Sequence, residues 1–284
     1  MALNKIKAHL QNIALSHSIF ALPFAFMGAF LAADGIPTMH DLFWITVAMV
    51  GARSAALALN NLIDLKYDKI HPRFTKRPMV TGAVKPKEAV ILIVVTLLIF
   101  FYAAAQLHPV CIKLAPLAIA PFCIYPYMKR FSWTCHLVLG LSLAVAPIGA
   151  WMAIRGDITL PILLLGLAQG VWIAGFDAVY AAQDVKFDKE HGLHSMPERF
   201  GVAGSLRLTK IMHVICIISF LLVGMLLELG GMYYLGVLMA ATVLVYQNMI
   251  VKPHDLSQVT QKYFMRNGLV GICLALFTIV SLYQ

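Results

Sequence analysis

The sequence predicts an all-α fold, a polytopic membrane helical bundle with nine transmembrane helices. Hydrophobic residues make up 61% of the 284 residues and only 12% are charged, whereas roughly a quarter of the residues in a soluble domain are charged. Apolar stretches long enough to cross a bilayer as a helix, roughly 20 residues each, recur along the whole chain. The alternating segments of about ten residues that are typical of a membrane β-barrel do not occur in the sequence.

We expect the nine spans to follow one another in a single domain of residues 1–284. Their approximate limits are 11–33, 42–63, 88–106, 109–127, 132–154, 158–182, 206–228, 231–251 and 263–283. Residues 4–16 are a candidate for a helix that lies along the membrane interface. Most connections are short, as antiparallel neighbouring helices require, but two loops, roughly 64–87 and 183–205, are long enough to be functional.

The distribution of basic residues predicts the orientation of the bundle. With the N-terminus in the cytoplasm, all 22 Lys and Arg residues fall on the cytoplasmic side except Arg53, Lys113 and Arg155. Because short cytoplasmic loops are enriched in Lys and Arg, we expect an integral protein of the bacterial inner (cytoplasmic) membrane with both long loops facing the cytoplasm. The net charge of +9 then reflects topology and contact with anionic membrane lipid, and we expect no nucleic-acid partner.

Two sets of polar residues lie at the cytoplasmic ends of predicted helices. The first set, spaced i, i+4 and i+8, consists of Asn60, Asp64 and Asp68. The second set, spaced i, i+7 and i+11, consists of Asp177, Asp184 and Asp188. At 3.6 residues per turn each set returns to one helix face. Because carboxylates near hydrocarbon are costly unless they face a wet cavity or a cation, both sets are candidates for a functional site.

The ligand chemistry of these side chains indicates Mg²⁺. Carboxylate and amide oxygens are hard ligands that suit Mg²⁺ better than zinc or copper, and Mg²⁺ usually leaves positions free for water and substrate phosphate. Cations accompany the acids: Arg53 lies two helical turns before Asn60, Arg73 and Arg77 follow the first set, and Lys129 follows the fourth span. Acids, a metal ion and several cations around one cavity predict a pyrophosphate site.

A secondary transporter that couples transport to the acids is the main alternative. It predicts interrupted spans with acids near the membrane midplane, whereas these acids stand at helix ends beside basic loops. A zinc site at His191 and His194 is a smaller alternative, in competition with ordinary loop histidines. The five cysteines lie in or beside apolar segments without CxxC pairs, and we expect them to be buried thiols.

The first two motifs of the chain resemble those of the UbiA-type membrane-embedded aromatic prenyltransferases. Their NDxxDxxxD motif is matched by Asn60, Asp64 and Asp68, with Asn61 where Asp is usual. The Arg-Thr-x-x-Arg-Pro pattern that follows it is matched from Arg73 to Pro78, with Phe74 in place of Thr.

Two further motifs extend this resemblance over the whole chain, in the family's order. The YxxxK motif is matched by Tyr125 and Lys129. The second acidic motif is matched by Gly175-Phe176-Asp177, Tyr180, Gln183-Asp184 and Asp188. Within the family, the segments 125–130 and 175–177 are similar to the 4-hydroxybenzoate polyprenyltransferase branch. The run from His191 to Pro197 is similar to a subgroup that serves menaquinone synthesis.

The resemblance implies a UbiA-like bundle that transfers a polyprenyl group, with Mg²⁺, from polyprenyl diphosphate to a ring carbon of an aromatic acceptor such as 4-hydroxybenzoate. The alternative acceptor is 1,4-dihydroxy-6-naphthoate. The expected metal ligands are Asn60, Asp64, Asp68, Asp177 and Asp184. The expected substrate-binding residues are Arg53, Arg73, Arg77, Tyr125, Lys129 and Tyr180. The expected catalytic acids are Asp64, Asp68, Asp177, Asp184 and Asp188.

Overall fold

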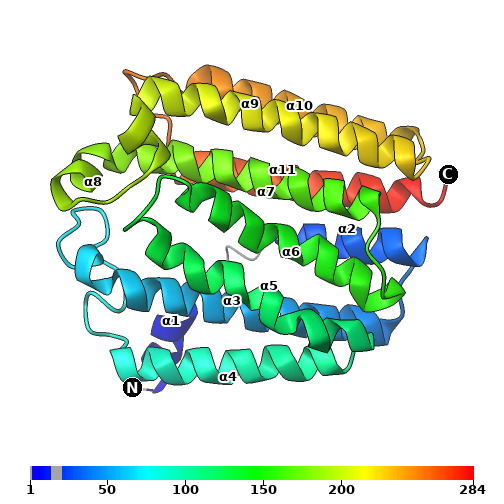
Figure 1. Cartoon of the computed structure of the whole chain (residues 1–284), viewed down its shortest axis with the longest axis horizontal. Helices are drawn as coiled ribbons and strands as arrows, with labels where there is room; N and C mark the ends of the chain where they lie inside the picture. Colours follow the sequence, from blue (N-terminus) through cyan, green and yellow to red (C-terminus); the bar gives the residue numbers. More distant parts are fainter. Residues whose placement is uncertain (1, 14–20) are drawn as a thin grey trace.

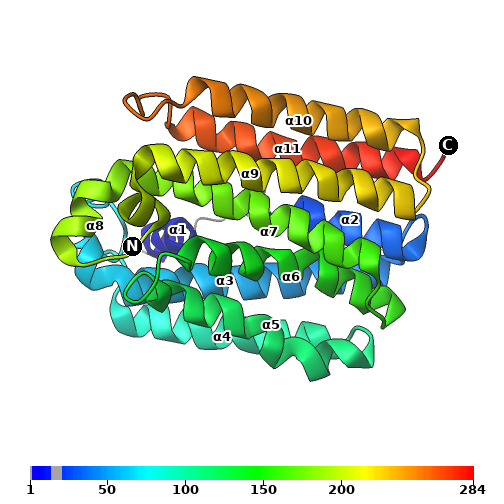
Figure 2. The same cartoon turned by 45° about the horizontal axis from the view of Figure 1, so that its top comes forward.

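The computed structural model describes residues 2–13 and 21–284. All regular secondary-structure elements in this part of the chain are helices. In chain order the helices are α1 (Ala2–Asn12), α2 (Leu22–Ala33), α3 (Met39–Asp68), α4 (Pro86–Ala105), α5 (Pro109–Met128), α6 (Cys135–Arg155), α7 (Leu160–Ala181), the 3₁₀ turn η2 (Ala182–Asp184), α8 (Val185–His191), α9 (Met196–Leu226), α10 (Gly231–Ile250) and α11 (Gln261–Ser281). The long helices run side by side along the longest axis of the molecule (Figures 1 and 2). The predicted all-α fold is therefore confirmed.

Seven described segments are long and apolar enough to cross a membrane. They are Met39–Asp68, Pro86–Ala105, Pro109–Met128, Cys135–Arg155, Leu160–His191, Met196–Leu226 and Gly231–Ile250. Two further apolar segments, Leu22–Ala33 and Met265–Ser281, are shorter and correspond to the first and last predicted spans. Residues 14–20 of the first predicted span lie outside the described residues. The helices thus agree in order with the nine predicted spans, and seven of them meet the length and hydropathy required for crossing.

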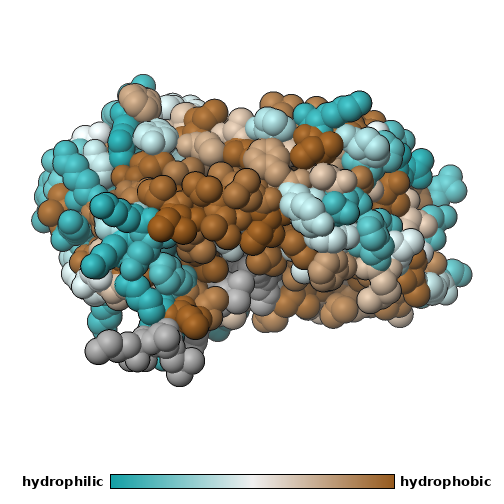
Figure 3. Space-filling view, turned by 90° about the horizontal axis from the view of Figure 1, so that it is seen from below, coloured by the Kyte–Doolittle hydropathy of each residue, from teal (hydrophilic) through white to brown (hydrophobic). Residues whose placement is uncertain are grey.

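Apolar side chains cover the middle of the molecule and hydrophilic side chains gather at its two ends. Figure 3 shows this arrangement on one face, where the central part of the visible surface is hydrophobic. Exposed large apolar residues occur on most of the long helices, for example Leu98 on α4, Leu117 on α5 and Met225 on α9. A surface of this kind is stable in contact with lipid tails and not with water.

The first helix, α1, lies beside the C-terminal part of α3 and the N-terminal end of α4. Lys5 forms an ion pair with Glu88 at 2.8 Å, and the Asn61 side-chain amide donates to the backbone oxygen of Asn12 at 2.7 Å. Ala8 is buried whereas Ile6 is 57% exposed, so one face of α1 packs on the bundle and the other faces outward. The helix expected for residues 4–16 is thus present as far as Asn12, residues 14–16 lie outside the described residues, and its position along the membrane interface stays a prediction.

Close approach of α6 and α7 fixes the frame on which the second acidic set is built. A Cβ atom added at Gly140 would lie 2.2 Å from the backbone oxygen of Gly170, so the two backbones touch without intervening side chains. Further along, α7 packs through its buried Trp172 into a core shared with α2, α9, α10 and α11. This helix is therefore held from several sides.

The two long loops of the prediction are shorter in the structure. α3 continues to Asp68 and leaves a loop of residues 69–85. The second expected loop, 183–205, contains η2, α8 and the beginning of α9, which starts at Met196 and is broken at Gly201 with φ 69°. Glycine tolerates this positive φ without a Cβ clash, which explains why the break falls at Gly201.

Candidate active site

The first acidic set lines a polar cavity of about 320 Å³ at the end of the bundle that carries α8. Asn60, Asp64 and Asp68 all contribute to its wall from the last three turns of α3. Their 3.6-residue spacing places them on one face, as predicted. Asp68 is 4% exposed and accepts a hydrogen bond from the guanidinium of Arg77. The arginine of the neighbouring loop thus neutralises the outermost acid of this face.

The second acidic set faces the same cavity from three successive elements. Asp177 lies on α7, Asp184 in η2 and Asp188 on α8, and all three line the cavity wall. The chain leaves the α-helix after Ala181, so these residues do not share one continuous helix face, although the predicted convergence holds. Arg73 donates to Asp184 at 2.6 Å, and the hydroxyl of Ser195 donates to Asp188 at 2.9 Å.

Lys129 and Tyr125 complete the wall between the two acidic sets. Lys129 is the C-cap residue of α5, and Tyr125 lies one turn earlier on the same helix. Both line the polar cavity, and Lys129 lies within electrostatic range of Asp64 and Asp177. The backbone oxygen of Lys129 accepts a hydrogen bond from the backbone N–H of His194 at 2.6 Å. The YxxxK segment is therefore tied to the loop that follows α8.

His71 joins the two acidic loops, and sequence reasoning missed it. Its Nε2 lies 3.4 Å from an oxygen of Asp184, and its ring packs against Phe74 and Phe187 with centroid distances of 4.4 and 4.2 Å. Burial lowers the pKa of the His71 imidazole, and Arg73 acts in the same direction, whereas Asp184 opposes it. The sequence of the proline-containing loop around His71 does not predict this contact, because it depends on tertiary packing between distant segments.

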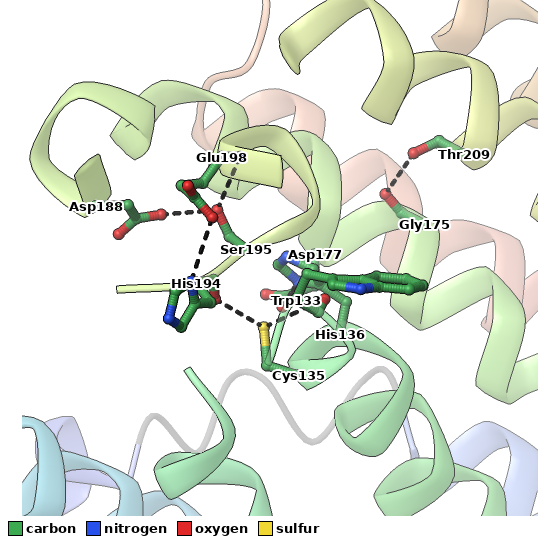
Figure 4. A network of polar contacts seen from close by, with 10 residues as sticks. All are labelled: Trp133, Cys135, His136, Gly175, Asp177, Asp188, His194, Ser195, Glu198 and Thr209. Atoms are coloured by element: carbon green, nitrogen blue, oxygen red, sulfur yellow. Dashed lines mark hydrogen bonds and ion pairs between the residues drawn. The ribbon is translucent and has the colours of Figure 1, made fainter. Parts of the chain in front are cut away.

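His136 was also missed, although it lies at the start of a predicted span. It is fully buried on α6, and its Nδ1 lies 2.7 Å from Asp177 Oδ2 (Figure 4). A histidine within an apolar segment is itself unusual enough to mark a functional candidate. Arg130, which the sequence indicated only as a cytoplasmic charge, donates to the backbone oxygen of Ile63 at 2.9 Å and lines the polar cavity.

An apolar cavity of about 810 Å³ borders the polar one. The two share Asn60, Arg77, Tyr125, Phe176 and Asp177 in their walls, and most of the remaining residues that line the larger cavity are apolar. Within the described part of the chain, Asp177 is the only carboxylate on that wall. The site can therefore hold an anionic group at one end and a long apolar group at the other.

Arg53 lines the apolar cavity and not the polar one. Its Nε is buried without a hydrogen-bond partner among the described residues. A guanidinium in this position requires an anionic partner, so the geometry agrees with a substrate-binding arginine. Tyr180 lines the polar cavity, as expected, while its hydroxyl donates to the backbone oxygen of Thr260 at 2.7 Å.

The donor set of the polar cavity fits Mg²⁺, although the acids are spread around its wall. Among residues 2–13 and 21–284, no three His, Cys, Asp or Glu side chains are close enough to hold a metal ion by themselves. Asn60 Oδ1 is buried and has no hydrogen-bond partner in the described part of the chain, so it is free to act as a hard oxygen ligand beside the carboxylates. Mg²⁺ takes few protein ligands and completes its shell with water and phosphate, which agrees with acids that surround a space.

His191 and His194 do not form a metal site with the described residues around them. His191 contacts the backbone oxygen of Phe187, and His194 lies 3.5 Å from Glu198. His191 lies on the exposed surface. All five cysteines are free thiols. Cys135 and Cys216 are buried as expected, whereas Cys111, Cys123 and Cys273 are half-buried.

Fold and site together define an integral membrane protein in which a polar cavity borders a larger apolar cavity. The model of the UbiA prenyltransferase family matches residues 21–269. The protein therefore belongs to the UbiA prenyltransferase family, and it is a prenyltransferase.

Curated relatives and solved structures agree with this assignment. The 4-hydroxybenzoate octaprenyltransferase of Vibrio campbellii is 28% identical over 286 residues, which cover 100% of both chains. That of Aeromonas hydrophila is 31% identical over 85% of this chain and 83% of its own. The apo structure of a UbiA homologue from Aeropyrum pernix K1 is 33% identical, covers 93% of this chain and 98% of its own, and superposes with a TM-score of 0.85. A UbiA homologue from Archaeoglobus fulgidus bound to DMAPP and Mg²⁺ is 16% identical, covers 96% of this chain and 99% of its own, and shares the fold with a TM-score of 0.72.

Proposed function

We propose that this enzyme transfers a polyprenyl group from polyprenyl diphosphate to a ring carbon of a hydroxylated aromatic carboxylate of the 4-hydroxybenzoate type, in quinone biosynthesis. One observation carries the proposal: a polar cavity with acids and guanidinium groups opens on a larger apolar cavity, and Asn60, Tyr125 and Asp177 stand on the wall of both. A diphosphate linked to an isoprenoid chain has this combination of a polar and an apolar end. The curated relatives named above support the acceptor class.

The polar cavity binds and orients the diphosphate. Asn60, Asp64, Asp68, Asp177 and Asp184 would hold Mg²⁺, which when bound neutralises charge on the departing diphosphate. Arg73, Arg77 and Lys129 donate hydrogen bonds and positive charge to phosphate oxygens in the same space. In this structure Arg73 contacts Asp184 and Arg77 contacts Asp68. When the diphosphate binds, these arginines therefore replace a carboxylate of the protein with a phosphate oxygen of the substrate.

The apolar cavity holds the isoprenoid chain and excludes water from the allylic carbon. Loss of diphosphate leaves positive charge on that carbon, and an electron-rich ring carbon of the acceptor forms the new bond. The acceptor then releases a proton. A carboxylate of the two acidic sets, all of which line the polar cavity, accepts this proton.

Arg53 is the natural partner for the acceptor's carboxylate. The sequence alone favoured contact with the diphosphate, but Arg53 lines only the apolar cavity, whereas Arg73 and Lys129 line only the polar one. A planar guanidinium matches a carboxylate in bidentate geometry. An aromatic acid bound by Arg53 would lie beside the isoprenoid chain.

A dihydroxynaphthoate acceptor is the second candidate. The segment from His191 to Pro197, which is similar to the menaquinone subgroup, connects α8 to α9, and its residues Leu193 and Ser195 line the polar cavity. A change of sequence in this loop therefore reaches the site directly. Whichever acceptor is used, we propose that the protein has nine membrane spans. We also propose that the site lies on the cytoplasmic side of a bacterial inner membrane, because the loops beside it are rich in Lys and Arg.

The test is product formation by purified protein in detergent with one labelled polyprenyl diphosphate and Mg²⁺. The acceptors are 4-hydroxybenzoate, 1,4-dihydroxy-6-naphthoate, 1,4-dihydroxy-2-naphthoate, phenol and protohaem. We expect turnover of the first or the second, with phenol at least about tenfold slower because it lacks a group for Arg53 to bind. Equal rates with phenol would remove the carboxylate from the proposal, and turnover of protohaem alone would move the enzyme to another branch.

Asp64→Asn provides the matched inactive control for this panel. A transporter makes a different prediction for the same purified protein: Mg²⁺ or proton flux in liposomes that Asp64→Asn abolishes, without prenylated product. Flux without product would refute the proposed function.

A further inference from the structure

A buried histidine on α6 holds one oxygen of Asp177. His136 Nδ1 lies 2.7 Å from Asp177 Oδ2, and both residues are seen close together in Figure 4. An ionised carboxylate only accepts hydrogen bonds, so Nδ1 carries the hydrogen and donates it. Nε2, on the other side of the ring, is buried without a hydrogen-bond partner among the described residues. The ring is therefore fixed by its contact with Asp177 and by packing.

Several contacts prevent the His136 ring from leaving this position. His136 is 0% exposed and stands in the first turn of α6. The preceding residue, Cys135, is also buried and directs its thiol to the backbone oxygen of His194 at 3.5 Å. One turn further along α6, Gly140 touches the backbone of Gly170 on α7. The distance between the two helices, and with it the reach of His136, is set by backbone contact.

The support of Asp177 differs from that of the other acids at the polar cavity. Asp68 forms an ion pair with Arg77, and Asp184 forms one with Arg73. Both arginines belong to the loop 69–85, and their side chains are about one third exposed. These groups are also the ones that phosphate oxygens would attract. Asp177 is held by a group inside the helical bundle that lines neither cavity. Its contact can therefore persist when a diphosphate binds.

We propose that His136 is a positioning residue, whose hydrogen bond to Asp177 Oδ2 directs Oδ1 of that carboxylate to the metal–diphosphate complex where the two cavities meet. The inference rests on the proposed function of the site. Asp177 then offers one oxygen in a fixed direction, and its second oxygen is occupied by the protein. Such outer hydrogen bonds to ligand carboxylates fix their orientation and contribute to metal affinity.

Binding of Mg²⁺ with inorganic pyrophosphate, measured by titration calorimetry on the purified protein in detergent, tests this role without turnover. The variants are His136→Ala and His136→Asn. Asn places its amide nitrogen close to the position of Nδ1 and can donate the same hydrogen bond, whereas Ala cannot. We expect His136→Ala to raise the Kd for pyrophosphate in saturating Mg²⁺ by about 10–100-fold, the usual effect of removing such a partner. His136→Asn should stay within about threefold of wild type.

His213→Ala is the matched control for loss of a buried histidine. His213 is 4% exposed on α9, contacts Asn248 at 2.7 Å and lines neither cavity. It should lower the melting temperature without changing the Kd for pyrophosphate. Wild-type affinity in His136→Ala would overturn the proposal. So would equal weakening in His136→Ala and His136→Asn, because the effect would then follow the loss of the ring and not of the hydrogen bond.

The outcome for the wild-type protein separates this inference from the proposed function. Wild type that binds Mg²⁺–pyrophosphate and prenylates an acceptor, together with an unaffected His136→Ala, refutes only the role of His136. Wild type that does neither refutes the proposed function itself.

Discussion

Replacement of Gly140 by alanine should loosen the bundle and weaken the site together. A Cβ at Gly140 would lie 2.2 Å from the backbone oxygen of Gly170, and ordinary contact begins at 3.4 Å. Both atoms belong to helical backbone, so α6 and α7 must move apart by about 1.2 Å to restore contact at 3.4 Å. The same movement would lengthen the contact between His136 and Asp177 from 2.7 Å to about 3.9 Å, beyond the reach of a hydrogen bond.

Two magnitudes follow for Gly140→Ala. Overpacking of a filled interior costs about 1–3 kcal/mol, which should lower the melting temperature in detergent. A displacement of about 1 Å near a reacting group can cost about 10²-fold in rate, so turnover should fall by one to two orders of magnitude at a temperature where the variant remains folded.

The assay pairs a detergent melting curve with prenyl transfer and pyrophosphate binding. Gly231→Ala, at the start of α10 where a Cβ would meet nothing within 4 Å, is the control and should resemble wild type in all three. If Gly140→Ala melts and turns over as wild type does, the helices can separate without cost and the backbone contact does not set the geometry of the site.

Three further predictions follow from the chemistry of the cavities. Excess EDTA should abolish turnover, and Mg²⁺ or Mn²⁺ should restore it, because the ligands are hard oxygens; full activity without metal would contradict the assignment. Asp64→Asn and Asp184→Asn should each lower turnover by about 10²-fold or more with little change in melting temperature; a collapsed melting curve would indicate a structural role instead. Arg53→Lys should raise the KM for the aromatic acceptor, because an ammonium cannot reproduce bidentate contact with a carboxylate; a raised Kd for the diphosphate alone would assign Arg53 to the donor.

The membrane helices could be predicted from the sequence because hydropathy and length depend on local sequence alone. The predicted span 109–127 differs from α5, Pro109–Met128, by one residue. The helical phase of Asn60, Asp64 and Asp68 was also correct, since α3 is continuous to Asp68. The second acidic set converged on the same cavity for a different reason, because η2 interrupts the helix between Asp177 and Asp188.

Pairings between distant segments could not be predicted in the same way. Arg73 and Asp184 are 111 residues apart in sequence, and His136 and Asp177 are 41 apart. No periodicity relates such residues, and each contact depends on how far neighbouring helices separate. That separation is decided at small residues such as Gly140, whose importance is visible only when the opposing backbone is in place. For the same reason the sequence did not indicate which cation lines which cavity: Arg53 lines the apolar cavity, whereas Lys129 lines the polar one.

The junction of the two cavities has a consequence for how the products leave. On the proposed function, the substrate that bridges the junction is severed there, close to Asp177, which stands on both walls. One fragment is a small, highly charged anion among arginines near the hydrophilic end of the molecule, and the other is an oil-like molecule surrounded by alanine, leucine and phenylalanine side chains. Each fragment then already lies in the cavity whose polarity matches its own. Breaking one bond separates the products by polarity, so neither needs to pass through the space that the other occupies on its way out.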